Sequence, residues 1–204
     1  NPYRKAGPLP STSPSYVERP CDQQLDADAN SQSLIAISGE FGIGKTSLMT
    51  RAKYRWRQSR MACWVDLEAT RTDDPHLFFR RFFEEISRQA KSAVYDWISL
   101  RELPDSQPLV LFLDEFGAIT KEVANPFLAG IHHIAQPDRL QIVAALPVSM
   151  PDFLLRVGVD NPKYRSNWSP IQVEPFDDQQ TDALLGLLPP VAQAAASSER
   201  EIIL

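Results

Sequence analysis

The sequence contains few residues of the kinds that form disulfide bonds or metal centres. Among its 204 residues are two cysteines and three histidines. Cys21 falls in a proline-rich leader and Cys63 in an expected strand, which indicates two free thiols and excludes a disulfide framework. His76, His132 and His133 are not spaced with cysteines or carboxylates as metal ligands are, so we interpret them as ordinary residues of helix surfaces.

Long apolar runs and an excess of positive charge are also lacking. No apolar stretch approaches the roughly 20 residues that a membrane span needs, and the start has no signal-peptide pattern. The formal net charge is -5, so no global positive field attracts the chain to nucleic acid or to anionic lipid. We therefore expect a cytoplasmic protein with no membrane partner.

A proline-rich segment precedes a region with the composition of a folded domain. The first thirty residues contain five prolines and few apolar side chains, which predicts an extended leader on the domain surface. With 204 residues, the chain is long enough for one α/β domain and part of a second. Since 43% of the residues are hydrophobic, such a domain can form a core.

Short apolar runs alternate with helical patterns from Leu34 onward, an order typical of βαβ units around a parallel sheet. Buried strands are expected at residues 34–38, 62–67, 109–113 and 140–146 and from Ile171 onward. Helices are expected at residues 46–58, 74–94 and 125–136.

The middle helix has the clearest local signals. Asp74 and Pro75 at its start predict an N-cap and the first helical position. Asn125 and Pro126 repeat that order and predict the start of the third helix. The apolar residues of the middle helix recur every four positions and indicate one buried face: Phe78, Phe82, Ile86 and Ala90.

The stretch GEFGIGKTS links the first expected strand to the first helix. Gly39, four further residues, and then Gly44, Lys45 and Thr46 match the phosphate-binding pattern G-x-x-x-x-G-K-[ST] in its strand-to-helix context. Glycines let backbone N–H groups approach phosphate oxygens, and the helix N-terminus adds positive potential. Lys45 supplies charge for the β- and γ-phosphates, and the Thr46 hydroxyl can bind Mg²⁺. This predicts a site for ATP or ADP with Mg²⁺, formed by Gly39, Gly42, Ile43, Gly44, Lys45, Thr46 and Ser47.

Two carboxylates follow a later buried strand in the stretch LVLFLDE, at the edge where open α/β sheets place their ligands. Asp114 can hold Mg²⁺ through water, and Glu115 can orient and deprotonate the attacking water as a general base. The alternative interpretation of the GEFGIGKTS stretch is a glycine-rich turn with a solvated lysine. That alternative does not explain why an Asp-Glu pair follows the later strand.

These residues resemble P-loop ATPases with an additional strand between the phosphate-loop strand and the Asp-Glu strand, a group that includes the AAA+ and STAND classes. Over residues 14–188, the segments SPSYVERPCDQQL, GEFGIGKTSLMTRA, ACWVDLEAT, LVLFLDE and IQVEPFDDQQTDALL look like the bacterial AAA-like domain of multidomain signalling proteins. The resemblance implies a three-layer α/β fold with a five-stranded, mainly parallel sheet in the order 5-1-4-3-2.

The resemblance also implies further site residues. It places Tyr16, Val17 and Arg19 near the adenine, whereas the residues alone also fit a proline-terminated leader with one snorkelling arginine. An arginine finger is expected in many relatives, and Arg165 is suitably placed before the fifth strand, with Arg156 as the other choice. A surface arginine without a role is the alternative for both.

Two features depart from the family. Pro147 stands where a polar sensor is usual at the tip of the fourth strand, and Ser149 is a weak substitute. Only the first helix of the family's helical lid, at residues 177–188, is expected before the sequence ends. We therefore expect a leader at residues 1–30, an ATPase core at residues 31–175 and the start of a truncated lid at residues 176–204.

The preferred interpretation is a regulatory ATPase that hydrolyses ATP slowly, with Lys45, Glu115 and Arg165 in catalysis and Thr46 and Asp114 at the metal. It would control self-association, other domains of a longer chain or an attached signalling effector. A non-hydrolysing nucleotide-binding module is one alternative. A DNA-associated ATPase of the transposition or replication-initiation type is another, but nucleic acid is not favoured, because the basic positions spread around a helix. That basic run has no acid partners in the sequence pattern: Arg51, Lys53, Arg55, Arg57 and Arg60.

Overall fold

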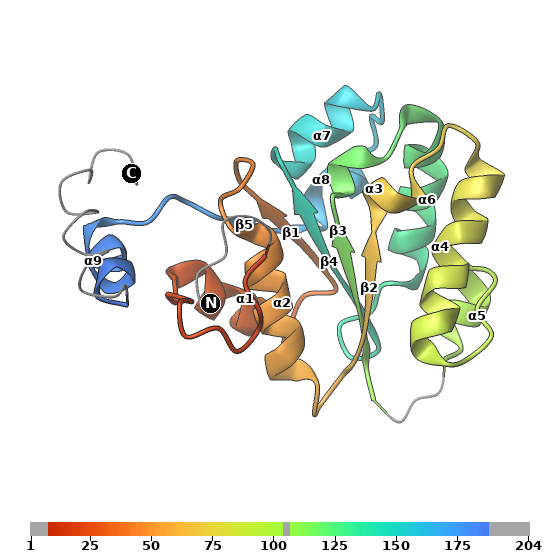
Figure 1. The fold of residues 1–204 in the computed structure, drawn as a ribbon. Coiled ribbons are helices and arrows are strands. Elements are labelled where there is room, and N and C mark those ends of the chain that lie inside the picture. The colour runs from red at the N-terminus through yellow and green to blue at the C-terminus, as the bar shows by residue number, and fades with distance from the viewer. Residues whose placement is uncertain (1–7, 104–106, 188–204) are drawn as a thin grey trace.

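A five-stranded sheet organises residues 8–103 and 107–187, the part of the chain that the computed structural model describes. All its pairings are parallel, and the strand order is β2-β3-β4-β1-β5 (Figure 1). This confirms the α/β fold and the predicted order 5-1-4-3-2. The strands are β1 (Leu34–Ser38), β2 (Met61–Asp66), β3 (Leu109–Asp114), β4 (Leu140–Leu146) and β5 (Ser169–Gln172).

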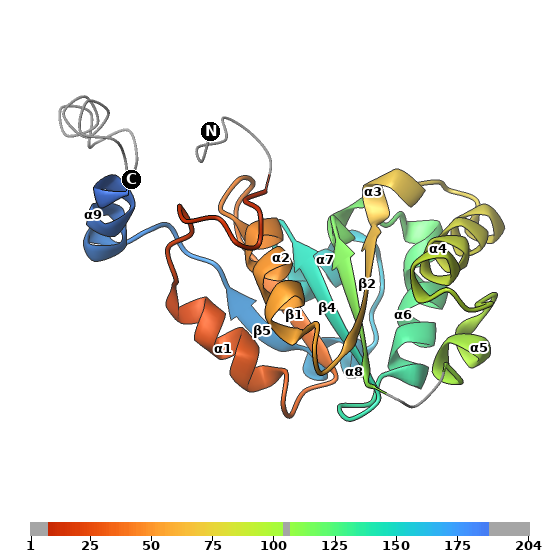
Figure 2. The same ribbon diagram turned by 60° about the horizontal axis from the view of Figure 1, so that its bottom comes forward.

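Helices cover both faces of the sheet, as Figures 1 and 2 show. Ile35 and Ile37 of β1 pack in a core with helices α1 and α2, whereas Leu34 and Ala36 pack in a larger core with α4, α6 and α7. The three layers thus follow from the period-two alternation of side chains in a buried strand. The helices are α1 (Pro20–Asp28), α2 (Lys45–Trp56), α3 (Leu67–Thr70), α4 (Pro75–Ala90), α5 (Trp97–Arg101), η1 (Phe116–Ala118), α6 (Lys121–Ile134), α7 (Met150–Arg156), α8 (Pro162–Ser166) and α9 (Asp178–Gly186).

The larger core is rich in aromatic side chains. Phe78 and Phe82 of α4 are buried, and both meet Phe127 of α6 edge to face, with ring centroids at 5.2 and 5.1 Å. Asp74 caps α4 by accepting two backbone hydrogen bonds, and Pro75 is its first residue, as predicted. Each buried phenylalanine contributes about 1.5–3 kcal/mol, so this layer gives β3 a firm support.

The leader is not extended throughout. We predicted extended backbone over residues 1–30, but Pro20–Asp28 forms helix α1. The Asp22 carboxylate caps the helix start by accepting the Arg19 N–H at 3.0 Å, and the Asp22 N–H donates to the Arg19 carbonyl oxygen at 2.9 Å. The proline at the helix start has a favourable φ. Leu25 is fully buried beside α2. A short apolar face, which the many prolines obscured, therefore stabilises this helix.

Helix α6 begins one turn before the start that we predicted at Asn125, so Pro126 lies inside the helix. The missing N–H of Pro126 would otherwise bond to the carbonyl of Glu122. Both residues are exposed, so water can bind that carbonyl. Val123 and Ala124 extend the buried stripe of the helix backward, and their burial outweighs the local start signal.

Smaller differences concern single residues. Strand β2 lies one residue before the predicted 62–67, and β5 begins two residues before Ile171. Cys63 and Cys21 are buried free thiols, as expected. His132 is not a surface residue, because it is half-buried with its ring 4.7 Å from Tyr164. Within the described ranges, no helix is both long and apolar enough to cross a membrane.

The predicted first lid helix, residues 177–188, corresponds to α9, and Asp177 is its N-cap. Residues 188–204 of the expected lid and residues 1–7 of the expected leader lie outside the described residues.

Candidate nucleotide-binding site

The phosphate-binding pattern forms the loop between β1 and α2, at the carboxyl edge of the sheet (Figure 2). Gly44 precedes α2 with a left-handed backbone at a φ of 101°, which favours glycine. A Cβ atom at Gly39 would lie 2.7 Å from the carbonyl oxygen of Val173, so glycine is also required there. The loop therefore presents the first N–H groups of α2 at this edge, as anion sites do.

Lys45 is held within this loop. Its Nζ donates hydrogen bonds to the carbonyl oxygens of Gly39 and Glu40, each at 2.7 Å. Burial lowers the pKa of the Lys45 ammonium, and the negative charges of Glu115 and Asp114 oppose that shift. The cation thus lies between the loop backbone and the acidic pair of β3.

Thr46 joins the loop to the acidic pair. Its Oγ1 donates to Oδ1 of Asp114 at 3.2 Å, although the two residues are 68 positions apart. Asp114 ends β3 and is 9% exposed. Burial raises the pKa of Asp114, while hydrogen bonds from Thr46 and from the Glu115 N–H at 3.1 Å oppose the rise. Hydroxyl and carboxylate oxygens are ligands that Mg²⁺ prefers, so this pair fits that ion.

Glu115 has an exposed side chain at the carboxyl end of β3. Its backbone is left-handed at a φ of 49°, which is uncommon for a residue with a Cβ atom and is often found at functional sites. The next residue, Phe116, is fully buried and starts the short helix η1. The buried ring anchors the turn, so Glu115 stays at the edge of the sheet.

A cavity of about 430 Å³ adjoins Glu115 and is also lined by Arg71, Pro147 and Arg156. Arg156 Nη2 donates to the carbonyl oxygen of Gly117 at 2.6 Å, so it braces the turn after Glu115. Pro147 touches the same turn, because a Cβ at Gly117 would lie 2.8 Å from its Cδ. Sequence analysis missed Arg71, since it belongs to no pattern and reaches the site only through the fold.

The structure places Arg165 away from the phosphate loop of the same chain, whereas Ser149 follows the carboxyl end of β4, next to β1, and hydrogen-bonds to Asp152. Arg165 lies in α8, which precedes the amino end of β5, and donates to Asp160 at 3.0 Å. Ser149 is the N-cap of α7 and accepts the N–H of Asp152 at 3.3 Å.

Arg19 joins the leader to the phosphate loop. Its Nη1 donates to the carbonyl oxygen of Ile43 at 2.9 Å, and its guanidinium lies 5.2 Å from the ring centroid of Phe176. Leu9 makes a second link, because its N–H donates to the Ser47 hydroxyl at 3.0 Å. Sequence analysis did not identify the roles of Leu9 and Phe176. A single buried arginine thus connects the leader, the loop and the segment after β5.

Tyr16 and Val17 precede Arg19 in the leader. The Tyr16 hydroxyl donates to Asp22 of α1 at 2.7 Å, and its ring lies 4.5 Å from the guanidinium of Arg51 in α2. Burial, followed by the hydrogen bond to Asp22, raises the pKa of Tyr16. Val17 is half-buried. These contacts join Tyr16 to α1 and α2.

The basic run divides between two sides of α2. Arg51 pairs with Glu18 at 3.0 Å, and Arg55 pairs with Asp26 at 3.0 Å. The expectation that the run has no acid partners was wrong for these two, because their partners lie in the leader and in α1, which we predicted to be extended. The other three residues line a separate cleft: Lys53, Arg57 and Arg60.

Neither the known family models nor the curated protein sequences match this chain. Solved structures do match it, however. A Walker-type ATPase of Pyrococcus abyssi is similar with a TM-score of 0.62 and 15% identity over 95% of this chain. The Drosophila ORC bound to DNA is similar with a TM-score of 0.58 and 14% identity over 80% of this chain. AMPPCP-bound DnaA from Aquifex aeolicus is similar with a TM-score of 0.52 and 14% identity over 86% of this chain.

This chain spans 66%, 43% and 53% of those three proteins, which is less than two thirds of each. At such low identity the similarity establishes the fold alone, which this chain shares with these three proteins.

Proposed function

We propose that this chain is an ATPase domain that binds ATP or ADP with Mg²⁺ and regulates an assembly or an attached effector through slow hydrolysis. The observation that carries the proposal is the 3.2 Å hydrogen bond from Thr46 to Asp114. It joins the phosphate-binding pattern to the acidic pair at the edge of the sheet where ligands of α/β folds bind. The fold similarity to Walker-type ATPases supports the same function.

Nucleotide binding would use the backbone of the loop first. The N–H groups at the start of α2 would bind phosphate oxygens, and Lys45 Nζ would exchange the carbonyls of Gly39 and Glu40 for the β- and γ-phosphates. Thr46 and Asp114 would hold Mg²⁺, which neutralises phosphate charge when it is bound.

Glu115 is the general base in this proposal. Its carboxylate accepts a proton from water while the water oxygen bonds to the γ-phosphorus and the bond from that phosphorus to the bridging oxygen of ADP breaks. The buried Phe116 and the hydrogen bond from Arg156 to Gly117 keep Glu115 in place. Catalysis here is mainly positioning and charge neutralisation.

Arg19 offers a route from the nucleotide to the rest of the protein. It bonds to the loop at Ile43 and contacts Phe176, shortly before α9. Any movement of the loop on nucleotide binding would change both contacts. Together with the resemblance of the YVERP and VEPF segments, this supports a regulatory ATPase of the bacterial STAND-type signalling class, with Tyr16 and Val17 beside the adenine.

Self-association is part of this proposal. Arg165 lies in α8, before the amino end of β5 and away from the phosphate loop of its own chain. Such a residue can serve as an arginine finger only for the nucleotide of a second copy. The finger would stabilise charge that develops on the phosphates of the neighbouring site.

Two observations favour other candidates. Pro147 packs on Gly117 at the place where a polar sensor is expected, which favours a non-hydrolysing nucleotide-binding module. Some proteins of similar fold are bound to DNA, and the cleft lined by Lys53, Arg57 and Arg60 favours a DNA-associated ATPase.

Calorimetry with a non-hydrolysable ATP analogue tests the proposed site. We expect the wild type to bind more tightly with Mg²⁺ than with EDTA, because Asp114 and Thr46 hold the ion. Asp114→Ala should lose this Mg²⁺ dependence, whereas the exposed Asp73→Ala should keep it. Undiminished Mg²⁺ dependence in Asp114→Ala would contradict the assignment of the metal site.

A further inference from the structure

A cleft of about 580 Å³ lies beside the start of β2, at the amino edge of the sheet and so at the opposite edge from the phosphate loop. We call it the amino-edge cleft. None of the described residues that line it is Asp or Glu, although the whole chain has a net charge of -5. Its basic residues come from α2, the loop that follows and the end of α4: Lys53, Arg57, Arg60 and Lys91.

The basic residues from α2 form one stripe. Lys53, Arg57 and Arg60 are spaced i, i+4 and i+7, which places them on one side of the helix and its continuing turn. Arg51 and Arg55 point to the other side, where acids of the leader and α1 neutralise them. The basic run as a whole spreads around the helix, but these three residues all line one cleft. Within it, the Arg60 guanidinium also donates to the side-chain oxygens of Gln141 and Asn30.

Aromatic rings accompany these cations. The guanidinium carbon of Arg57 lies 3.5 Å from the ring centroid of Tyr54, which is 38% exposed. Lys53 Nζ lies 5.9 Å from the ring centroid of Trp64. Proteins that bind single nucleic-acid strands combine cations for phosphates with aromatic or guanidinium planes on which bases stack. The carboxylates of an acidic polypeptide would pair with the cations, whereas the bases of a nucleic-acid strand would also stack on the aromatic and guanidinium planes.

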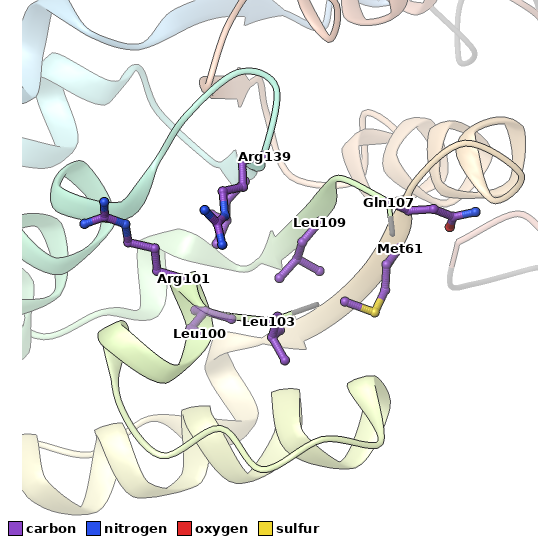
Figure 3. A pocket seen from close by; sticks show the side chains of 8 residues that line it. Met61, Leu100, Arg101, Leu103, Gln107, Leu109 and Arg139 are labelled. Atoms are coloured by element: carbon purple, nitrogen blue, oxygen red, sulfur yellow. The ribbon is translucent and has the colours of Figure 1, made fainter. Parts of the chain in front are cut away.

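The cleft continues beyond a single phosphate site. Met61, Leu103 and Gln107 also line an adjoining smaller cavity, whose lining includes Arg101 and Arg139 (Figure 3). Basic side chains therefore extend from α2 past the start of β2 towards α5 and the loop before β4, where Arg101 and Arg139 also line a further cavity that includes Glu102. Such an extended arrangement suits a linear polyanion better than a compact anion.

We propose that the amino-edge cleft binds the phosphate backbone of a single nucleic-acid strand. The four cations of the cleft contact phosphates, and the exposed ring of Tyr54 with the Arg57 plane stacks on a base. The site is separate from the phosphate loop, so nucleotide and nucleic acid can bind at the same time.

Fluorescence anisotropy with a labelled single-stranded oligodeoxynucleotide tests this. If four phosphates are neutralised, the logarithm of the affinity should fall with the logarithm of salt concentration with a slope of about -3. The double variant Arg57→Gln with Lys91→Asn removes two cations, and asparagine tolerates the left-handed backbone of Lys91 at a φ of 53°. We expect it to bind at least about tenfold more weakly and with about half the slope.

The matched control is the double variant Arg80→Gln with Arg88→Gln, which also removes two cations. Both arginines belong to α4, are exposed and lie outside the cleft. It should bind like the wild type. Circular dichroism and ATP-analogue binding show whether each variant is folded. Photo-crosslinking of the wild-type chain needs no substitution and should locate the oligonucleotide on peptides from the end of α2 and the end of α4.

Three results would overturn the proposal. The first is no binding by the wild type at low salt. The second is equal binding by the cleft variant and the wild type, or crosslinks only at other surfaces. The third is equally tight binding of polyglutamate of the same charge, which would identify an acidic protein segment as the partner instead.

Discussion

The two edges of the sheet hold their charged residues in different ways. At the carboxyl edge, Lys45 bonds to loop carbonyls and Thr46 bonds to Asp114, so each group has a position fixed by backbone or by another side chain. At the amino edge, Arg57 donates to the carbonyl oxygen of Tyr54 in its own turn at 2.7 Å, and together with Lys91 it lines an open cleft with no carboxylate among its described residues. Fixed groups suit chemistry at one phosphate, whereas open cations suit reversible contact with a polyanion.

Helix α2 shows why the same type of residue serves both purposes. Arg55 and Arg57 are two positions apart, but Arg55 pairs with Asp26 of α1 and Arg57 faces the cleft. What packs on each side of a helix, rather than the charge pattern along it, decides which cations remain available to a partner.

The largest expected effect separates the two edges by activity. Glu115→Gln keeps the size of the side chain but removes the base, so single-turnover ATP hydrolysis should fall by about 10² or more while ATP binding persists. The exposed Glu122→Gln is the matched control and should hydrolyse at the wild-type rate. A wild-type rate in Glu115→Gln would place the base elsewhere.

The next effect concerns the neutralised side of α2. Asp22 is 3% exposed and accepts hydrogen bonds from the Tyr16 hydroxyl and the Arg19 N–H. Asp22→Ala leaves those donors without a partner, so we expect a loss of about 2–4 kcal/mol in the free energy of unfolding. Urea unfolding would measure it, with Asp73→Ala as the exposed control. Equal midpoints for both variants would show that α1 is not held through this carboxylate.

The smallest effect concerns the core behind the amino edge. Burial lowers the pKa of His132 below its usual 6.5, so the folded state disfavours the proton that the unfolded chain accepts. Stability is therefore retained above pH 6.5 and falls as the pH drops below it. Between pH 7 and 5, the wild type should therefore lose more of its free energy of unfolding than His132→Phe does, as urea unfolding at each pH would show. Parallel pH profiles of the two proteins would contradict this.

Local patterns account for what could be predicted. The positions of the strands and the cap at Asp74 depend on short stretches of sequence, and the structure agrees closely with both. The order of the strands was implied by the family resemblance, and the structure agrees with it as well. Lys45 and Thr46 occur in one contiguous loop, and Asp114 directly ends a strand, so spacing and strand context were sufficient to predict that they lie at one edge of the sheet.

The features that could not be predicted from the sequence depend on contacts between distant segments of the chain. The partner of Arg55 lies in a helix that the prolines of the leader obscured, and Arg19 reaches Ile43 across 24 positions. Lys91 joins the stripe on α2 only because α4 ends beside the start of β2. Such contacts cannot be predicted from the periodicity of a single sequence.

The most direct test of the central claim is the affinity of the chain for ATP with Mg²⁺ when Lys45 is replaced by Ala. The Lys45 ammonium is the cation that the phosphate loop itself holds, through the carbonyls of Gly39 and Glu40. Calorimetry should find binding weakened at least about tenfold in Lys45→Ala, with the unfolding midpoint close to that of the wild type. Equal affinity in the two proteins would contradict the assignment of this loop as the nucleotide site.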